Sequence, residues 1–66
     1  MRVWVVTRAP ADRLWAYEFV GVFRSLPEAE ASVHFSAGTY TIAEMEVGRR
    51  YAGDVRNIVV IEKALK

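Results

Sequence analysis

The sequence predicts a small α+β domain, in which an antiparallel or mixed sheet of three to four strands carries one helix on one face. The expected element order is β-β-α-β-β. Short β-branched and aromatic runs, typical of strands, recur along the chain. One strong helix-start signal lies between them. With 66 residues, the chain is long enough for only one domain, so residues 1–66 are treated as a single unit.

The first two apolar runs predict a hairpin. Residues 2–8 (RVWVVTR) and residues 14–23 (LWAYEFVGVF) have the composition of strands. Residues 9–13 (APADR) contain Pro and Asp and predict a turn or short loop. Because a short loop joins the two runs, we expect them to pair antiparallel.

The helix has the clearest local signal. Ser25 followed by Glu28 forms a capping box, and Pro27 fits the first turn, where its missing N–H is not needed. We expect the helix to run from about Leu26 to Phe35. Residues 36–38 (SAG) should end it, since glycine is the usual terminator.

Two further strands are expected after the helix. Residues 39–47 (TYTIAEMEV) alternate as a strand does, and residues 57–61 (NIVVI) form a β-branched run. Residues 48–56 (GRRYAGDVR), polar with two glycines, predict a loop between them. Residues 62–66 form a charged tail.

The order of these motifs resembles a group of short bacterial and phage proteins of uncharacterised function. The matching motifs lie within residues 1–47: Val3, Val5, Val6 and Thr7 in a V-x-V-V-T strand, Val20-Gly21-Val22-Phe23, and Ser25, Glu28, Ala29 and Glu30 at the helix start. The resemblance implies a ββαβ fold and no particular activity. The layout is also similar to that of small phage-encoded inhibitors of host RNA polymerase, which implies a host-directed inhibitor or accessory factor.

The first two predicted strands are apolar on both faces, whereas one short helix can cover only one face. Under the helix we expect a core that consists of Val3, Val5, Phe19, Phe23, Leu26, Ala29, Val33 and Ile42. The opposite face then lacks a cover, and exposed apolar surface of this kind marks interfaces. The interface candidates are Trp4, Val6, Val20 and Val22.

Two outcomes are open for that face. In the first, the open side is covered because the last strand, residues 57–61, or the loop of residues 48–56 folds back over it. Alternatively, the face binds a second copy, most simply in a twofold homodimer, or an unidentified protein. Association is expected because a 66-residue chain without cysteine is marginally stable on its own.

Composition excludes several classes of protein. The absence of cysteine excludes a disulfide scaffold and a Cys-type zinc module. Nine Lys and Arg against eight Asp and Glu disfavour a strongly basic nucleic-acid module, and 53% apolar residues exclude a disordered chain. Because neither a signal peptide nor a membrane-spanning segment is visible, we expect a cytoplasmic protein.

The sequence predicts no enzyme, no cofactor and no metal site. The single histidine, His34, has no cysteine or nucleophile motif near it. Glu30 and His34 have the i,i+4 spacing that can hold a metal, but two ligands alone are more typical of a solvated helix face. Glu44 and Glu46 alternate along one strand, where carboxylates usually keep an edge soluble.

The alternative function is nucleic-acid binding by the basic, aromatic loop that contains Arg49, Arg50, Tyr51 and Arg56. Arginine contacts phosphates and tyrosine stacks on bases. Nearby acidic residues cancel most of this charge, so we expect instead a non-enzymatic protein-interaction module.

Overall fold

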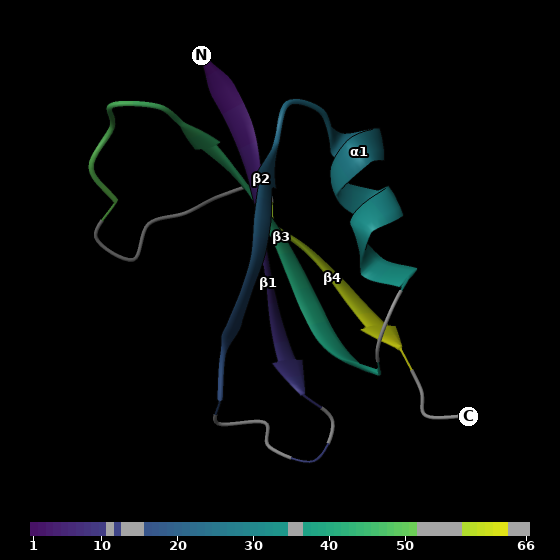
Figure 1. Cartoon of the computed structure of the whole chain (residues 1–66). Coiled ribbons are helices and arrows are strands. Elements are labelled where there is room, and N and C mark those ends of the chain that lie inside the picture. The colour runs from purple at the N-terminus through teal and green to yellow at the C-terminus, as the bar shows by residue number, and fades with distance from the viewer. Residues whose placement is uncertain (11, 13–15, 35–36, 52–57, 64–66) are drawn as a thin grey trace.

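The computed structural model describes residues 1–10, 12, 16–34, 37–51 and 58–63 (Figure 1). Four strands and two short helical segments follow one another along the chain. They are β1 (Arg2–Pro10), β2 (Glu18–Phe23), the helix α1 (Leu26–Ala31), the 3-10 turn η1 (Ser32–His34), β3 (Gly38–Glu46) and β4 (Ile58–Lys63).

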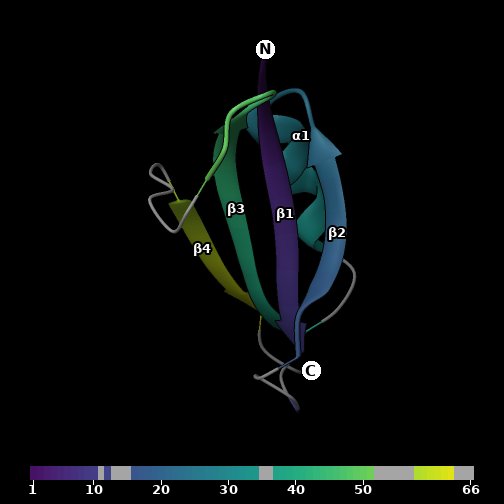
Figure 2. The same ribbon diagram turned by 90° about the vertical axis from the view of Figure 1, so that its left-hand side faces the viewer.

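The strands form one antiparallel sheet in the order β2-β1-β3-β4, so the predicted α+β class and the hairpin of the first two strands are confirmed. Since β2 and β3 are both antiparallel to β1, they run in the same direction on either side of it. The connection between them must therefore cross one face of the sheet. This connection contains α1, which lies behind the sheet in Figure 2.

The start of α1 is where the sequence predicts it. Ser25 has extended backbone angles, and its Oγ accepts a hydrogen bond from the backbone N–H of Glu28 at 3.3 Å. In return, the Glu28 carboxylate accepts a hydrogen bond from the backbone N–H of Arg24 at 3.3 Å. These two bonds satisfy donors that a helix start leaves unpaired.

The helix is shorter than predicted. It ends at Ala31, where the expected end was Phe35. The Ser32 hydroxyl donates a hydrogen bond to the Ala29 carbonyl at 2.6 Å, and Val33 leaves helical geometry with φ −90° and ψ 28°. Side-chain bonds of this kind compete with helix continuation. Residues 32–34 form η1 instead.

The start of β3 requires glycine. Gly38 pairs with Pro10 at the end of β1 and has a φ of +144°, which side-chain-bearing residues rarely adopt. A Cβ at this position would lie 2.6 Å from the Ala9 carbonyl oxygen. Next to it, the Arg8 Nε donates a hydrogen bond to the Ala37 carbonyl at 3.0 Å, which fixes the chain entering β3.

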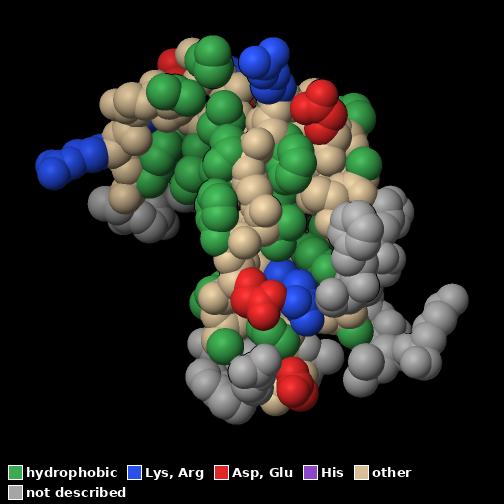
Figure 3. Space-filling view, in the orientation of Figure 1, with side chains coloured by type: hydrophobic (Ala, Val, Ile, Leu, Met, Phe, Trp, Pro, Cys, Tyr) green, Lys and Arg blue, Asp and Glu red, His purple; other side chains and the backbone are tan. Residues whose placement is uncertain are grey.

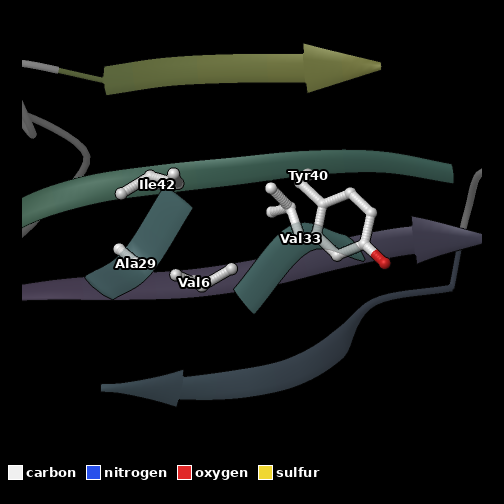
Figure 4. Packing of buried hydrophobic residues seen from close by; sticks show 5 residues of the cluster. All are labelled: Val6, Ala29, Val33, Tyr40 and Ile42. Atoms are coloured by element: carbon white, nitrogen blue, oxygen red, sulfur yellow. The ribbon is translucent and has the colours of Figure 1, made fainter. Parts of the chain in front are cut away.

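The core lies between α1 and the central strands. Its five buried side chains come from β1, α1, η1 and β3, and Figure 4 shows them gathered under the helical segments: Val6, Ala29, Val33, Tyr40 and Ile42. Four partly buried side chains pack around them: Trp4, Phe23, Leu26 and Ile61. Val6 and Ile42 are paired directly across β1 and β3 and are both fully buried.

The predicted core is correct on the helix and wrong on β1. Ala29, Val33 and Ile42 are buried as expected, and Phe23 and Leu26 pack against them. Val3 and Val5 lie on the opposite face, because alternation along β1 puts them on the side that Val6 does not occupy. The two faces of β1 are therefore exchanged relative to the prediction.

A β-bulge explains why Phe19 also leaves the predicted core. Val6 pairs with Gly21, but the next residue of β1, Thr7, pairs with Phe19, so that Val20 is an extra residue in β2. Because paired residues share a face, the extra residue moves Phe19 to the face of Thr7, away from α1. Phe23, beyond the bulge, stays on the helix side and its ring lies over Gly21.

Candidate protein-interaction surface

The face of the sheet that points away from α1 has no cover within the described part of the chain (Figure 2). We call it the open face. Pairing across the four strands places mostly apolar side chains and threonines on it, with one carboxylate at its end: Val3, Val5, Thr7, Ala9, Phe19, Val22, Thr39, Thr41, Ala43, Met45, Ile58, Val60 and Glu62.

The outer strands carry the most exposed apolar side chains of this face. Phe19 and Val22 on β2 are 67% and 52% exposed, and Ile58 and Val60 on β4 are 48% and 59% exposed. Four strands spaced about 4.8 Å apart and about six residues long cover about 400 Å². This area is in the range of the largest apolar patch on a typical monomer, about 300–600 Å², and such patches are often functional.

The four interface candidates from the sequence separate into two pairs. Val20 and Val22 are exposed, as expected of interface residues. Val6 is fully buried and Trp4 packs against the core, so the prediction that these two lie on an uncovered face is wrong. The physical reason is that α1 covers the face of Trp4 and Val6, and the face of Val5 is left open.

Pattern analysis missed the contribution of β4 to this surface. β4 contains four consecutive apolar residues, Ile58 to Ile61. A strand with one face in the core and the other in water would instead alternate apolar and polar residues. Val59 and Ile61 pair with Ile42 and Tyr40 and lie on the helix side. The uninterrupted apolar run therefore indicates that β4 also has apolar side chains on the face opposite the helix.

The two edges of the sheet differ in how they are protected. β2 carries the bulge at Val20 and, at its start, Glu18, whose carboxylate forms an ion pair with Arg8. Both features discourage another strand from pairing with an edge. β4 pairs with β3 without a register shift and carries its charges only at its end, in Glu62 and Lys63. Figure 3 looks onto the β2 edge, where hydrophobic side chains lie on both sides of the strand.

The last strand does not fold back over the open face. β4 pairs with β3 and extends the sheet sideways, which excludes that part of the expected alternative. Residues 47–51, which follow β3, leave the sheet on the side opposite α1 (Figures 1 and 2). Residues 52–57, the rest of this loop, lie outside the described residues.

In the candidate nucleic-acid loop, two of the residues contact each other. The Arg49 guanidinium lies 5.2 Å from the centre of the Tyr51 ring, and the Tyr51 hydroxyl accepts a hydrogen bond from the backbone N–H of Glu46 at 2.7 Å. The cation therefore occupies a ring face on which a base would stack. Arg50 is exposed, and Arg56 lies outside the described residues.

One of the two acidic residues on β3 contacts a cation. Glu44 forms an ion pair with Arg2 at 3.1 Å, on the side of the sheet that carries Trp4. Among the described residues, no group of three His, Asp or Glu side chains is arranged to hold a metal ion. Glu30 lies in α1 and His34 in η1, so the helical i,i+4 spacing expected for this pair is interrupted.

Comparison with known proteins gives no match: no family model, no curated protein and no solved structure matches this chain. Among the residues that the structure describes, no helix has the length and apolar character needed to cross a membrane.

Proposed function

We propose that this protein is a non-enzymatic protein-interaction module that works as a homodimer and binds a partner protein through its open face. The observation that carries the proposal is the apolar open face, which no described segment covers. Burying a Val or Phe side chain that is otherwise exposed contributes about 1.5–3 kcal/mol, so several such residues on one surface favour binding.

The composition of the open face supports a protein as its occupant. Most side chains on it are aliphatic, aromatic or threonine, and its one charge within the four strands is Glu62, near the end of β4. The charges of β1, Arg2 and Arg8, lie on the helix side. Nucleic acid would require a surface rich in Arg and Lys. A flat apolar sheet surface instead matches another apolar protein surface.

The small core supports the homodimer. Within the described part of the chain, the core cluster has only five buried side chains, and α1 is six residues long. A small domain with such a core has limited stabilisation of its own. Association with a second copy buries further surface, and the resulting stabilisation increases with the logarithm of the protein concentration. In keeping with the resemblance of the motifs to phage proteins, we propose that the dimer acts in the cytoplasm as an accessory or inhibitory protein of a phage or mobile element, occupying the surface of a host protein.

The experiment combines light scattering with binding of the apolar dye ANS. We expect a mass of twice the 7.5 kDa chain at high concentration and clear ANS fluorescence. Val22→Lys places a charge on the open face and should lower ANS fluorescence. The matched control Val47→Lys changes a similarly exposed valine in the turn after β3 and should leave the fluorescence unchanged. A 7.5 kDa monomer that binds no ANS would contradict the proposal.

A further inference from the structure

We propose that the two copies of the homodimer pair edge to edge through β4, so that the sheet continues across the dimer and the two open faces form one surface. This inference rests on the proposed homodimer and names the segment that forms it. The second copy is the occupant of the β4 edge, and the open face stays free for the partner protein.

The exposure of β4 is the first support. Ile58, Val59 and Val60 are 48%, 37% and 59% exposed, although they are consecutive residues of one strand. Successive residues of a strand point to opposite faces. β4 is therefore accessible from both faces, and no described strand pairs with its outer edge. An added strand would cover parts of all three.

The contrast with β2 is the second support. An unpaired edge strand without bulge, proline or central charge is a template for pairing with another chain. In β4, the residues from Ile58 to Ile61 have none of these features, and Glu62 and Lys63 lie only at the end of the strand. In β2, the extra residue Val20 interrupts the regular edge.

The sequence of β4 also fits antiparallel pairing with itself. A twofold axis perpendicular to the sheet keeps each face on its own side, so paired residues must share a face. A register centred on Val60 pairs Val60 with its own copy, Val59 with Ile61, and Ile58 with Glu62. Glu62 then does not lie opposite its own copy, and three of the five pairs are apolar on both sides. Centring the register on Ile61 instead places valines opposite both charged residues.

The area of the open face favours edge pairing over face-to-face packing. Packed face to face, two open faces of about 400 Å² bury about 800 Å² in total, less than the about 1,200–2,000 Å² of a standard protein interface. Side by side, they offer a partner protein about 800 Å², which is the share that each partner contributes to such an interface. Residues 47–51 project from the sheet on the open-face side (Figures 1 and 2), so a second flat sheet does not lie flush against that end of the face.

The test compares two lysine variants by light scattering and sedimentation over a concentration series. Val59 lies on β4 but on the helix side, outside the open face, whereas Val22 lies on the open face at the far edge. Edge pairing predicts that Val59→Lys raises the dissociation constant of the dimer about tenfold or more, because the lysine lies against the apolar Ile61 of the second copy. Val22→Lys should leave this dissociation constant unchanged.

The outcomes separate this inference from the proposed function. If Val22→Lys abolishes the dimer and Val59→Lys does not, the copies pack face to face, and edge pairing is refuted while the homodimer stands. If both variants dimerise as the wild type does, a different surface forms the dimer and edge pairing is again refuted. A wild type that is monomeric at every concentration refutes the homodimer itself.

If Val59→Lys fails to fold, amide hydrogen exchange on the wild-type protein tests edge pairing instead. Edge pairing predicts that alternate N–H groups of β4 gain protection of about tenfold or more between dilute and concentrated samples, because they become hydrogen bonded. The N–H groups of β2 that face solvent are the internal control and should not change. Equal exchange of both edges at all concentrations would overturn the inference.

Discussion

Replacing Val6 and Val5 by alanine, one at a time, tests which face of the sheet lies under the helix. The two residues are adjacent in β1 and chemically identical, but Val6 is fully buried in the core and Val5 is partly exposed on the open face. Val6→Ala removes two methyl groups, which is about 1.6 kcal/mol of transfer free energy. A cavity of about 50 Å³ adds about 1.2 kcal/mol, for a total of about 3 kcal/mol.

For a domain of this size, a loss of about 3 kcal/mol lowers the melting temperature by roughly 15 °C. Val5→Ala leaves no closed cavity, and we expect it to cost about 1 kcal/mol or less. Urea unfolding followed by circular dichroism measures both, and repeating it at tenfold lower protein concentration shows whether association contributes. If Val5→Ala destabilised the protein as much as Val6→Ala, the assignment of the two faces would be refuted.

Three further predictions concern the start of β3, the helix cap and the basic loop. Gly38→Ala should lower the free energy of unfolding by about 2 kcal/mol or more, because the position has a positive φ and the new Cβ would lie 2.6 Å from the Ala9 carbonyl oxygen. Gly48→Ala, with a φ of +89° and nothing nearby, should cost about 1 kcal/mol in the same urea experiment. Ser25→Ala removes the acceptor at the start of α1 and should lower the unfolding free energy by about 1 kcal/mol. In gel shifts at two salt concentrations, wild type should show no nucleic-acid binding; salt-dependent binding that Arg49→Ala and Arg50→Ala abolish would favour the nucleic-acid alternative instead.

Signals that depend on a few neighbouring residues predicted the structure well. The start of α1 at Leu26 follows from the cap of Ser25 and Glu28, and the structure has both hydrogen bonds of these side chains. The hairpin of the first two strands follows from the short connection between two β-branched runs. The end of α1 is harder to predict. The expected terminating segment, residues 36–38, places the helix end at Phe35, but the Ser32 hydroxyl bonds to the Ala29 carbonyl and α1 ends four residues earlier, at Ala31.

The assignment of the sheet faces could not be obtained from alternation alone. Val3 and Val5 are as apolar as Trp4 and Val6, so neither set is marked as the buried one. The bulge at Val20 made the problem harder, because a one-residue insertion exchanges the faces of everything before it in β2. Gly21 was the available signal, since a glycine within a strand often marks a bulge.

The central claim is that the open face and β4 form a protein-binding surface, and one matched pair of variants tests it most directly. Val60 lies on β4 and on the open face, and Val47 lies in the turn after β3; each is 59% exposed. Sedimentation equilibrium should show that Val60→Lys is monomeric at concentrations where Val47→Lys and the wild type are dimeric. Dimers of equal stability in all three proteins, or monomers in all three, would contradict the account.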